Sequence, residues 1–139
     1  MNALTILLGV HMITGITHLT LFVRDQDEAL KFYTEKLGFT VHTDADMSGM
    51  RWLTLNPKGQ KDFELVLFHA EGTDTSLIGK QGGTGILMCL SSDNLDKDYK
   101  DLKAKGIEFI DEPEEHPWGK SVTMKDLYGN LLYLVQPAQ

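Results

Sequence analysis

The chain has 139 residues, 42% of them apolar, which is enough for one domain with a buried core. Thirteen basic side chains stand against twenty acidic ones, and the net charge of −7 argues against a nucleic-acid partner. The single cysteine, Cys89, excludes an internal disulfide and predicts a cytoplasmic protein, and no apolar run is long enough to cross a membrane.

The first predicted segment is an amino-terminal extension, residues 1–11, ahead of one domain spanning residues 12–139. The extension is apolar but has neither a positively charged leading region nor a small-residue cleavage site, so we expect no export signal. Two placements stay open for it: on the surface of the domain, or paired with another chain.

The next elements follow the order strand, helix, strand, strand, strand. Apolar and polar side chains partly alternate over residues 16–23, and a helical spacing of apolar side chains then ends at Gly38. Branched and aromatic side chains between turn residues indicate three further strands, at residues 38–46, 50–59 and 62–69. We therefore predict a βαβββ module over residues 13–71.

The second half of the chain repeats this beginning. The stretch 25–38 starts with aspartate and ends with glycine, and so does the equally long stretch 93–106, which is evidence of a duplication. A glycine-rich linker at 72–84 and a second module at 85–137 follow. The predicted fold class is α+β: two βαβββ modules form a curved mixed sheet around a cavity, with the helices outside.

Alternation along the strands predicts which side chains face the cavity. With Leu19 against the helices, His18 and Thr20 point inward, as does Glu64, which we expect to face His18. Cys89 falls on the core side. The further inward positions are Ile16, Phe22, Met50, Trp52, Thr54, Val66, Phe68, Ile86, Met88, Leu90, Ser121, Thr123, Leu131, Tyr133 and Val135.

Four stretches carry a family resemblance: "HLTLFVRDQDEALKFYTEKLGF", "FELVLF", "DNLDKDYKDLKAKG" and "DLYGNLLYLVQ". They resemble the vicinal oxygen chelate superfamily, also called the glyoxalase/bleomycin resistance/dioxygenase superfamily. The resemblance implies paired modules around a small-molecule cavity, usually in a homodimer, and in many members a divalent metal. It does not choose among the functions of that superfamily, which include lyases, dioxygenases and antibiotic-binding proteins.

The resemblance also implies where a metal would bind: at His18, at Glu64, and at their counterparts in the second half, Ile86 and Tyr133. The last two are not ordinary ligands, whereas a catalytic zinc typically needs three protein ligands. No spacing places a third ligand, for which the candidates are His42, His116 and a partner chain. We therefore predict an incomplete metal site and no cofactor, with a divalent metal as the alternative.

The preferred function is binding of a small molecule in an aromatic-lined cavity centred on His18, Glu64, Trp52 and Tyr133. His18 and Glu64 are also the candidate acid and base. The remaining predicted ligand contacts are Trp118, Thr20 and Ile86. Arg51 is interpreted as a solvated charge, with neutralisation of a ligand anion as the alternative, and the acidic run at 111–117 as a solvated loop.

Two other functions stay open. The first is a metal-dependent lyase or dioxygenase that uses His18 and Glu64 to hold a cation, which would polarise the oxygens of a substrate. The second is a non-catalytic interaction module that forms oligomers through its sheet edges and its amino-terminal extension. Whether the protein is an enzyme is not decided by the sequence.

Overall fold

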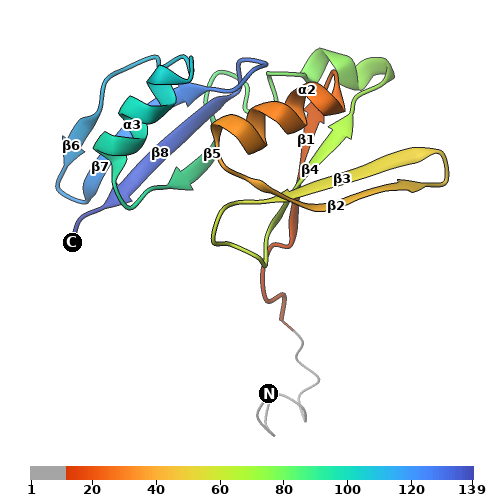
Figure 1. Ribbon diagram of the computed structural model, residues 1–139, viewed down its shortest axis with the longest axis horizontal. Coiled ribbons are helices and arrows are strands. Elements are labelled where there is room, and N and C mark those ends of the chain that lie inside the picture. Colours follow the sequence, from red (N-terminus) through yellow and green to blue (C-terminus); the bar gives the residue numbers. More distant parts are fainter. Residues whose placement is uncertain (1–11) are drawn as a thin grey trace, which may run out of the picture.

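The computed structural model describes residues 12–139, which form two four-stranded sheets side by side (Figure 1). The strand order is β1-β4-β3-β2 in the first sheet and β5-β8-β7-β6 in the second. In each sheet one parallel pair, β1 with β4 or β5 with β8, accompanies antiparallel neighbours. This arrangement confirms the α+β fold class. The prediction for residues 1–11 lies outside the described residues.

Both modules run in the expected order. The first consists of β1 (His18–Val23), α2 (Gln26–Lys31), a π-helical turn η1 (Phe32–Lys36), β2 (Thr40–Met47), β3 (Met50–Asn56) and β4 (Glu64–His69). A short 3-10 helix, η2 (Gly72–Leu77), occupies part of the connection. The second consists of β5 (Ile86–Ser91), α3 (Leu95–Ala104), β6 (Glu114–His116), β7 (Gly119–Lys125) and β8 (Leu131–Pro137).

Local sequence explains where the two helices begin. The side chain of Asp25 accepts a hydrogen bond from the backbone N–H of Glu28 (2.9 Å), which caps α2. Asn94 caps α3 in the same way, by accepting from the N–H of Lys97 (3.2 Å). None of the described helices has the length and apolar character needed to span a membrane.

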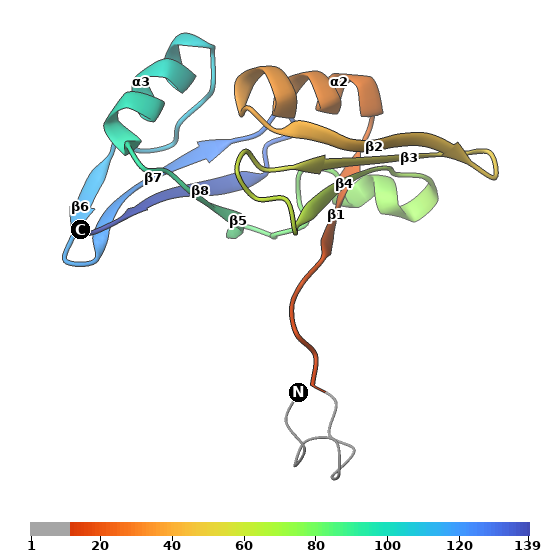
Figure 2. The same cartoon turned by 60° about the horizontal axis from the view of Figure 1, so that its bottom comes forward.

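The main core lies between the sheets and the helices. Figure 2 shows α2 and α3 on the same side of the two sheets. The buried side chains Leu21 and Leu53 of the first sheet belong to one apolar cluster with Met124 and Leu132 of the second. The modules therefore share a core, and the opposite faces of both sheets, which we call the open faces, point away from it.

A buried polar junction joins the modules at the resemblance motifs. Tyr33, within "FYTEKLGF", donates a hydrogen bond from its hydroxyl to Oδ2 of Asp126 (2.7 Å), within "DLYGN". Asp126 also accepts from the side-chain amide of Asn130 and from the backbone N–H groups of Tyr128 and Asn130, each at 2.9 Å. Burial of these groups requires such pairing. The two motifs thus fasten one module to the other.

Replacing Tyr33 by phenylalanine tests this junction through pH. Burial, followed by the charge of Asp126, raises the pKa of the Tyr33 hydroxyl well above its usual value. Above about pH 10 the tyrosine loses its proton in the unfolded state but keeps it in the folded state. The free energy of unfolding is therefore unaffected below about pH 10 and falls by about 1.4 kcal/mol per pH unit above it, until the raised pKa is reached. In urea unfolding we expect the wild type to lose stability above pH 10 more steeply than Tyr33→Phe. Equal slopes would contradict the assignment.

The connection between the modules covers one sheet edge. β1 is an edge strand, so it has backbone groups that no strand pairs. The side chain of Gln81 accepts a hydrogen bond from the N–H of Phe22 (2.7 Å) and donates one to the carbonyl oxygen of Thr20 (2.9 Å). This side chain therefore pairs with the edge of β1 in the way that a neighbouring strand would.

An extra residue shifts the register of β5. Ile86 pairs with Leu131, but Met88 pairs with Leu132, so Leu87 has no partner of its own on β8. Such a bulge reverses the faces of the residues that follow it, because side chains alternate along a strand.

This shift corrects three sequence-based assignments. Met88 and Leu90 were predicted to point inward, but both pack against the core. Cys89 was predicted on the core side, but it pairs with Tyr133 and is exposed. The prediction of strict alternation was wrong here because a bulge leaves no mark in the apolar pattern.

Candidate functional site

His18 and Glu64 lie together on the open face of the first sheet. They are register partners on the parallel strands β1 and β4, and Nε2 of His18 is 3.1 Å from Oε2 of Glu64. The other ring nitrogen, Nδ1, is hydrogen-bonded to the hydroxyl of Thr17 (2.9 Å). The hydroxyl of Thr54, which is fully buried, donates to Oε1 of Glu64 (2.7 Å). The predicted contact between His18 and Glu64 is thus present.

A second histidine contacts the same carboxylate. Nδ1 of His42, on β2, lies 2.9 Å from Oε1 of Glu64 and is hydrogen-bonded to the hydroxyl of Thr43 (2.8 Å). The side chain of Glu64 is 17% exposed, against 47% for His42 and 40% for His18. A largely covered carboxylate between two half-exposed imidazoles therefore forms the centre of this face.

Two further predicted ligand contacts lie near this centre. The indole of Trp52 on β3 is tilted against the imidazole of His18, with the ring centroids 6.2 Å apart. Thr20 is exposed on β1, two residues after His18 and hence on the same face. The first sheet thereby presents an aromatic surface beside its polar centre.

The second sheet carries a separate cluster around Ser121. The hydroxyl of Tyr133 donates to Oγ of Ser121 (2.7 Å), and Nε2 of His116 lies 2.7 Å from the same oxygen. The ring of Trp118 stacks on that of His116, with centroids 4.6 Å apart and planes 8° apart. Trp118 and Tyr133 are therefore brought together, but with Ser121 and His116 rather than with His18 and Glu64.

Several large apolar side chains outside the core are exposed in the single chain. Among them are Met50 (42%) and Ile86 (40%), which were predicted to point inward, and Trp118 (49%), which was predicted to contact the ligand. Exposed apolar surface of this kind is typical of regions that another molecule covers.

Two surface pockets lie on the helix side. One, of about 290 Å³, is lined by Tyr99 and Lys103 of α3 together with residues 107 and 109–112. The other, of about 320 Å³, lies at the start of α2 and includes Arg51. Neither contains His18, Glu64, Trp52 or Tyr133, so an enclosed cavity around these four stays a prediction.

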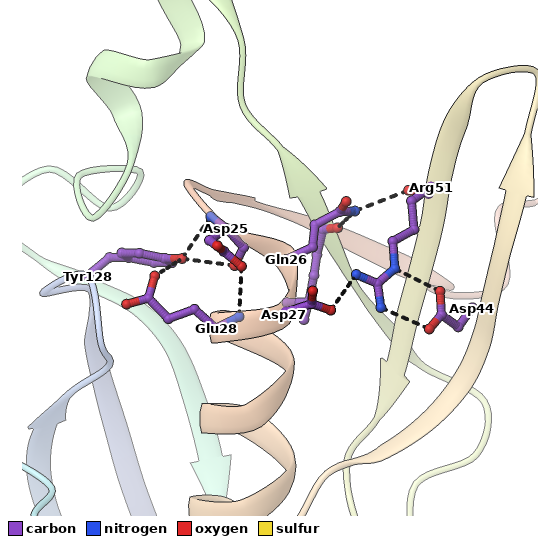
Figure 3. Close-up of polar contacts among 8 residues, drawn as sticks. Asp25, Gln26, Asp27, Glu28, Asp44, Arg51 and Tyr128 are labelled. Atoms are coloured by element: carbon purple, nitrogen blue, oxygen red, sulfur yellow. Dashed lines mark hydrogen bonds and ion pairs between the residues drawn. The ribbon is translucent and has the colours of Figure 1, made fainter.

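Arg51 has acidic partners of its own on the helix side. Figure 3 shows its guanidinium between Asp27 of α2 (2.7 Å) and both carboxylate oxygens of Asp44 on β2 (2.9 Å each). The hydrogen bonds to Asp44 and then Asp27 raise the pKa of Arg51 above its usual value. Its charge is matched within the chain, which leaves Arg51 a poor candidate for binding a ligand anion.

The side chains present do not fit a complete metal site. Among residues 12–139, no three His, Cys, Asp or Glu side chains are arranged to hold a metal ion. Both oxygens of Glu64 already have partners within the chain. Ile86 and Tyr133, which the resemblance gives as the counterpart positions, carry no ligand group of the usual kind and are not register partners, because Ile86 pairs with Leu131 and Tyr133 pairs with Cys89. We therefore derive no chemistry that passes through a metal.

Three residues of these clusters had no assigned contact from the sequence: His42 and His116 were named only as candidates for a third metal ligand, and Ser121 only as an inward position. His42 is the unpaired residue of a bulge, which alternation does not predict. Ser121 was placed inward, but its contact with His116 depends on β6, within a run interpreted as a solvated loop. The sequence signal that could have identified His42 and His116 as site residues was their residue type. Each histidine lies on a strand of a module that also contains a predicted site residue.

Comparisons with known proteins agree with this architecture. The sequence profile described as "Glyoxalase/Bleomycin resistance protein/Dioxygenase superfamily" matches residues 15–134. An uncharacterised protein from Shewanella frigidimarina (strain NCIMB 400) is 34% identical over 125 residues, which cover 88% of this chain and 93% of the relative.

Two solved structures are similar over nearly their whole length. The crystal structure of UcmS2 has a TM-score of 0.79 and 33% identity, covering 89% of this chain and 98% of its own. That of TnmS3, described as an antibiotic binding protein from Streptomyces sp. CB03234, has a TM-score of 0.77 and 32% identity, covering 92% and 100%.

Proposed function

The chain belongs to the glyoxalase/bleomycin resistance protein/dioxygenase superfamily, and on that premise we propose that it binds a small organic molecule without a complete metal site. The binding surface is the open face of the sheets. The observation that supports this proposal is the cluster of His18, His42 and Glu64 beside the indole of Trp52. Small-molecule sites usually combine apolar and aromatic surface with a small number of polar groups.

The similarity to TnmS3 supports the same class of function, because that protein is described as antibiotic-binding. We propose that Trp52, Thr20 and the His18–Glu64 pair contact one part of the ligand. Ile86, Trp118 and Tyr133 of the second sheet would contact another. Proton transfer between ligand and the His18–Glu64 pair is a second candidate function, which their 3.1 Å contact favours.

We propose a cytoplasmic homodimer as the working form. Exposed apolar side chains such as Met50, Ile86 and Trp118 give a second chain apolar surface to cover. Cys89 is an exposed free thiol, which suits a reducing compartment. A symmetric dimer would bring the open face of one chain toward surface contributed by the other.

Tryptophan fluorescence and thermal shift test the binding proposal. We expect aromatic antibiotics, including bleomycin, to quench fluorescence and raise the melting temperature of the wild type. Trp52→Leu should weaken binding about tenfold, since loss of a buried aromatic contact costs about 1–2 kcal/mol. Elemental analysis should find no stoichiometric metal, and a chelator should leave affinity unchanged.

Ile110→Ala serves as the matched control. Ile110 is an exposed apolar side chain (52%) among the residues that line the pocket beside α3, and that pocket includes none of the proposed contact residues. Its replacement should leave affinity as in the wild type. Absence of quenching and of a thermal shift with every compound would end the binding proposal. Equal losses for Trp52→Leu and Ile110→Ala would move the site away from the open face.

A further inference from the structure

We infer that His42 recognises the ligand directly, by accepting a hydrogen bond at its Nε2 from an O–H or N–H group. This inference rests on the proposed function and adds to it the chemical class of the ligand. That class is a neutral aromatic compound with a hydrogen-bond donor next to its ring.

A β-bulge aims His42 at the open face. Val41 pairs with Leu55 and Thr43 pairs with Thr54, two adjacent residues of β3, so His42 is the extra residue between them. Bulges redirect side chains and are common beside functional sites. Here the redirected imidazole reaches across β3 to Glu64 on β4. Strict alternation would not bring both His42 and Thr43 to this side.

Glu64 determines which nitrogen of His42 carries the proton. A carboxylate oxygen accepts hydrogen bonds but does not donate them. A bare nitrogen lone pair at 2.9 Å from Oε1 of Glu64 would be repelled, so the neutral ring carries its proton on Nδ1. In this tautomer the single Nδ1–H donates to the hydroxyl oxygen of Thr43, at 2.8 Å, and lies beside the carboxylate of Glu64. In this tautomer Nε2 is a hydrogen-bond acceptor.

The acceptor nitrogen is available to a ligand. Within residues 12–139 the structure contains no hydrogen-bond partner for Nε2 of His42, and 47% of the side chain is exposed. His18 differs in this respect. Its Nε2 faces Glu64 and its Nδ1 bonds to Thr17, so both ring nitrogens are already engaged. Of the two imidazoles at this site, His42 is the one with an acceptor to offer.

The surroundings indicate the class of compound. Glu64 places a negative charge beside the acceptor, which disfavours an anionic ligand and favours a donor. Trp52, which contacts His18 on the same face, supplies apolar and aromatic surface. A hydroxyl or amine on an aromatic ring satisfies both requirements. A matched pair of probes is 2-naphthol, which has the donor, and 2-methoxynaphthalene, which lacks it.

Nitrogen-15 NMR of the histidine rings tests the tautomer without any ligand. In wild-type protein at about pH 8 we expect the His42 ring to carry its proton on Nδ1, as seen in long-range proton–nitrogen correlation spectra. Loss of the His42 signals in His42→Asn would assign them. A proton on Nε2 would overturn the inference, because that nitrogen would then donate rather than accept.

Probe binding tests the role of Nε2. By chemical-shift titration we expect the wild type to bind 2-naphthol about fivefold more tightly than 2-methoxynaphthalene, the effect of about one hydrogen bond. His42→Asn keeps an amide near the position of Nδ1 and should lose this preference. His42→Gln, whose amide oxygen reaches the position of Nε2, should keep most of it.

His69→Asn is the matched control. His69 is a half-exposed histidine on the face of β4 opposite to Glu64, and its Nδ1 lies 3.5 Å from the carboxylate of Glu71. The preference should survive this change. If the wild type binds both probes equally, or if His42→Asn keeps the preference, the inference fails while the proposed function stands. If neither probe binds, the proposed binding of aromatic compounds fails as well.

Discussion

Asp126→Ala is expected to lower the free energy of unfolding by about 4 kcal/mol, because several donors lose their acceptor in a buried site. The carboxylate accepts from the Tyr33 hydroxyl, from the Asn130 amide and from two backbone N–H groups, at 2.7–2.9 Å. Asp126 and Asn130 are 5% and 2% exposed, so water does not readily replace these bonds. Urea unfolding at neutral pH measures the loss.

Two variants define the origin of that loss. Tyr33→Phe removes a single donor and should cost about 1 kcal/mol at neutral pH. Asp93→Ala, at an exposed aspartate near the start of α3, should change stability by less than about 0.5 kcal/mol. A loss below 1 kcal/mol for Asp126→Ala would show that the junction contributes little to folding.

The expected importance of this junction explains why the family resemblance did not identify the ligand. Two of the motifs that carry it, "FYTEKLGF" and "DLYGN", meet at Tyr33 and Asp126 on the helix side of the chain. The proposed binding residues lie on the opposite faces of the sheets. Residues that keep two modules together are thus separate from residues that would contact a ligand, and the former need not report on the latter.

Alternation predicted β1 and β4 of the first module well because both strands are regular. Their residues pair one to one from His18 with Glu64 to Val23 with His69, so an inward assignment at one end holds along the strand. The apolar residues Leu19 and Leu21 pack in or against the core, which leaves His18 and Thr20 on the open face. Here the sequence pattern and the register carry the same information.

The two main failures share one physical cause. An extra residue at His42 in β2 and another at Leu87 in β5 each interrupt the register. Neither bulge has a glycine at the extra position that would have marked it in the sequence. One bulge hid a residue of the proposed site, and the other reversed the assignment of Cys89. The pairing with a neighbouring strand determines where a bulge lies. The apolar pattern of one strand alone carries no information about that pairing.

Gly79→Ala is expected to lower the free energy of unfolding by about 3 kcal/mol, through two additive effects. Gly79 has a φ of +76°, which costs a residue with a Cβ about 1–2 kcal/mol. A Cβ at this position would also overlap the backbone carbonyl oxygen of Tyr128, so the connection or the "DLYGN" turn would have to move. The strain therefore acts on the same junction that Asp126 holds.

Gly83→Ala separates the two effects. Gly83 lies in the same connection with a φ of +65°, but a Cβ there meets nothing within 4 Å. We expect it to lose only the conformational part, about 1–2 kcal/mol, in the same urea titration. Equal losses for the two variants would mean that the contact with Tyr128 yields without cost. A larger loss for Gly79→Ala would show that the connection packs tightly against the turn at Tyr128. Gly79 lies two residues before Gln81, whose side chain pairs with the edge of β1 beside the proposed site.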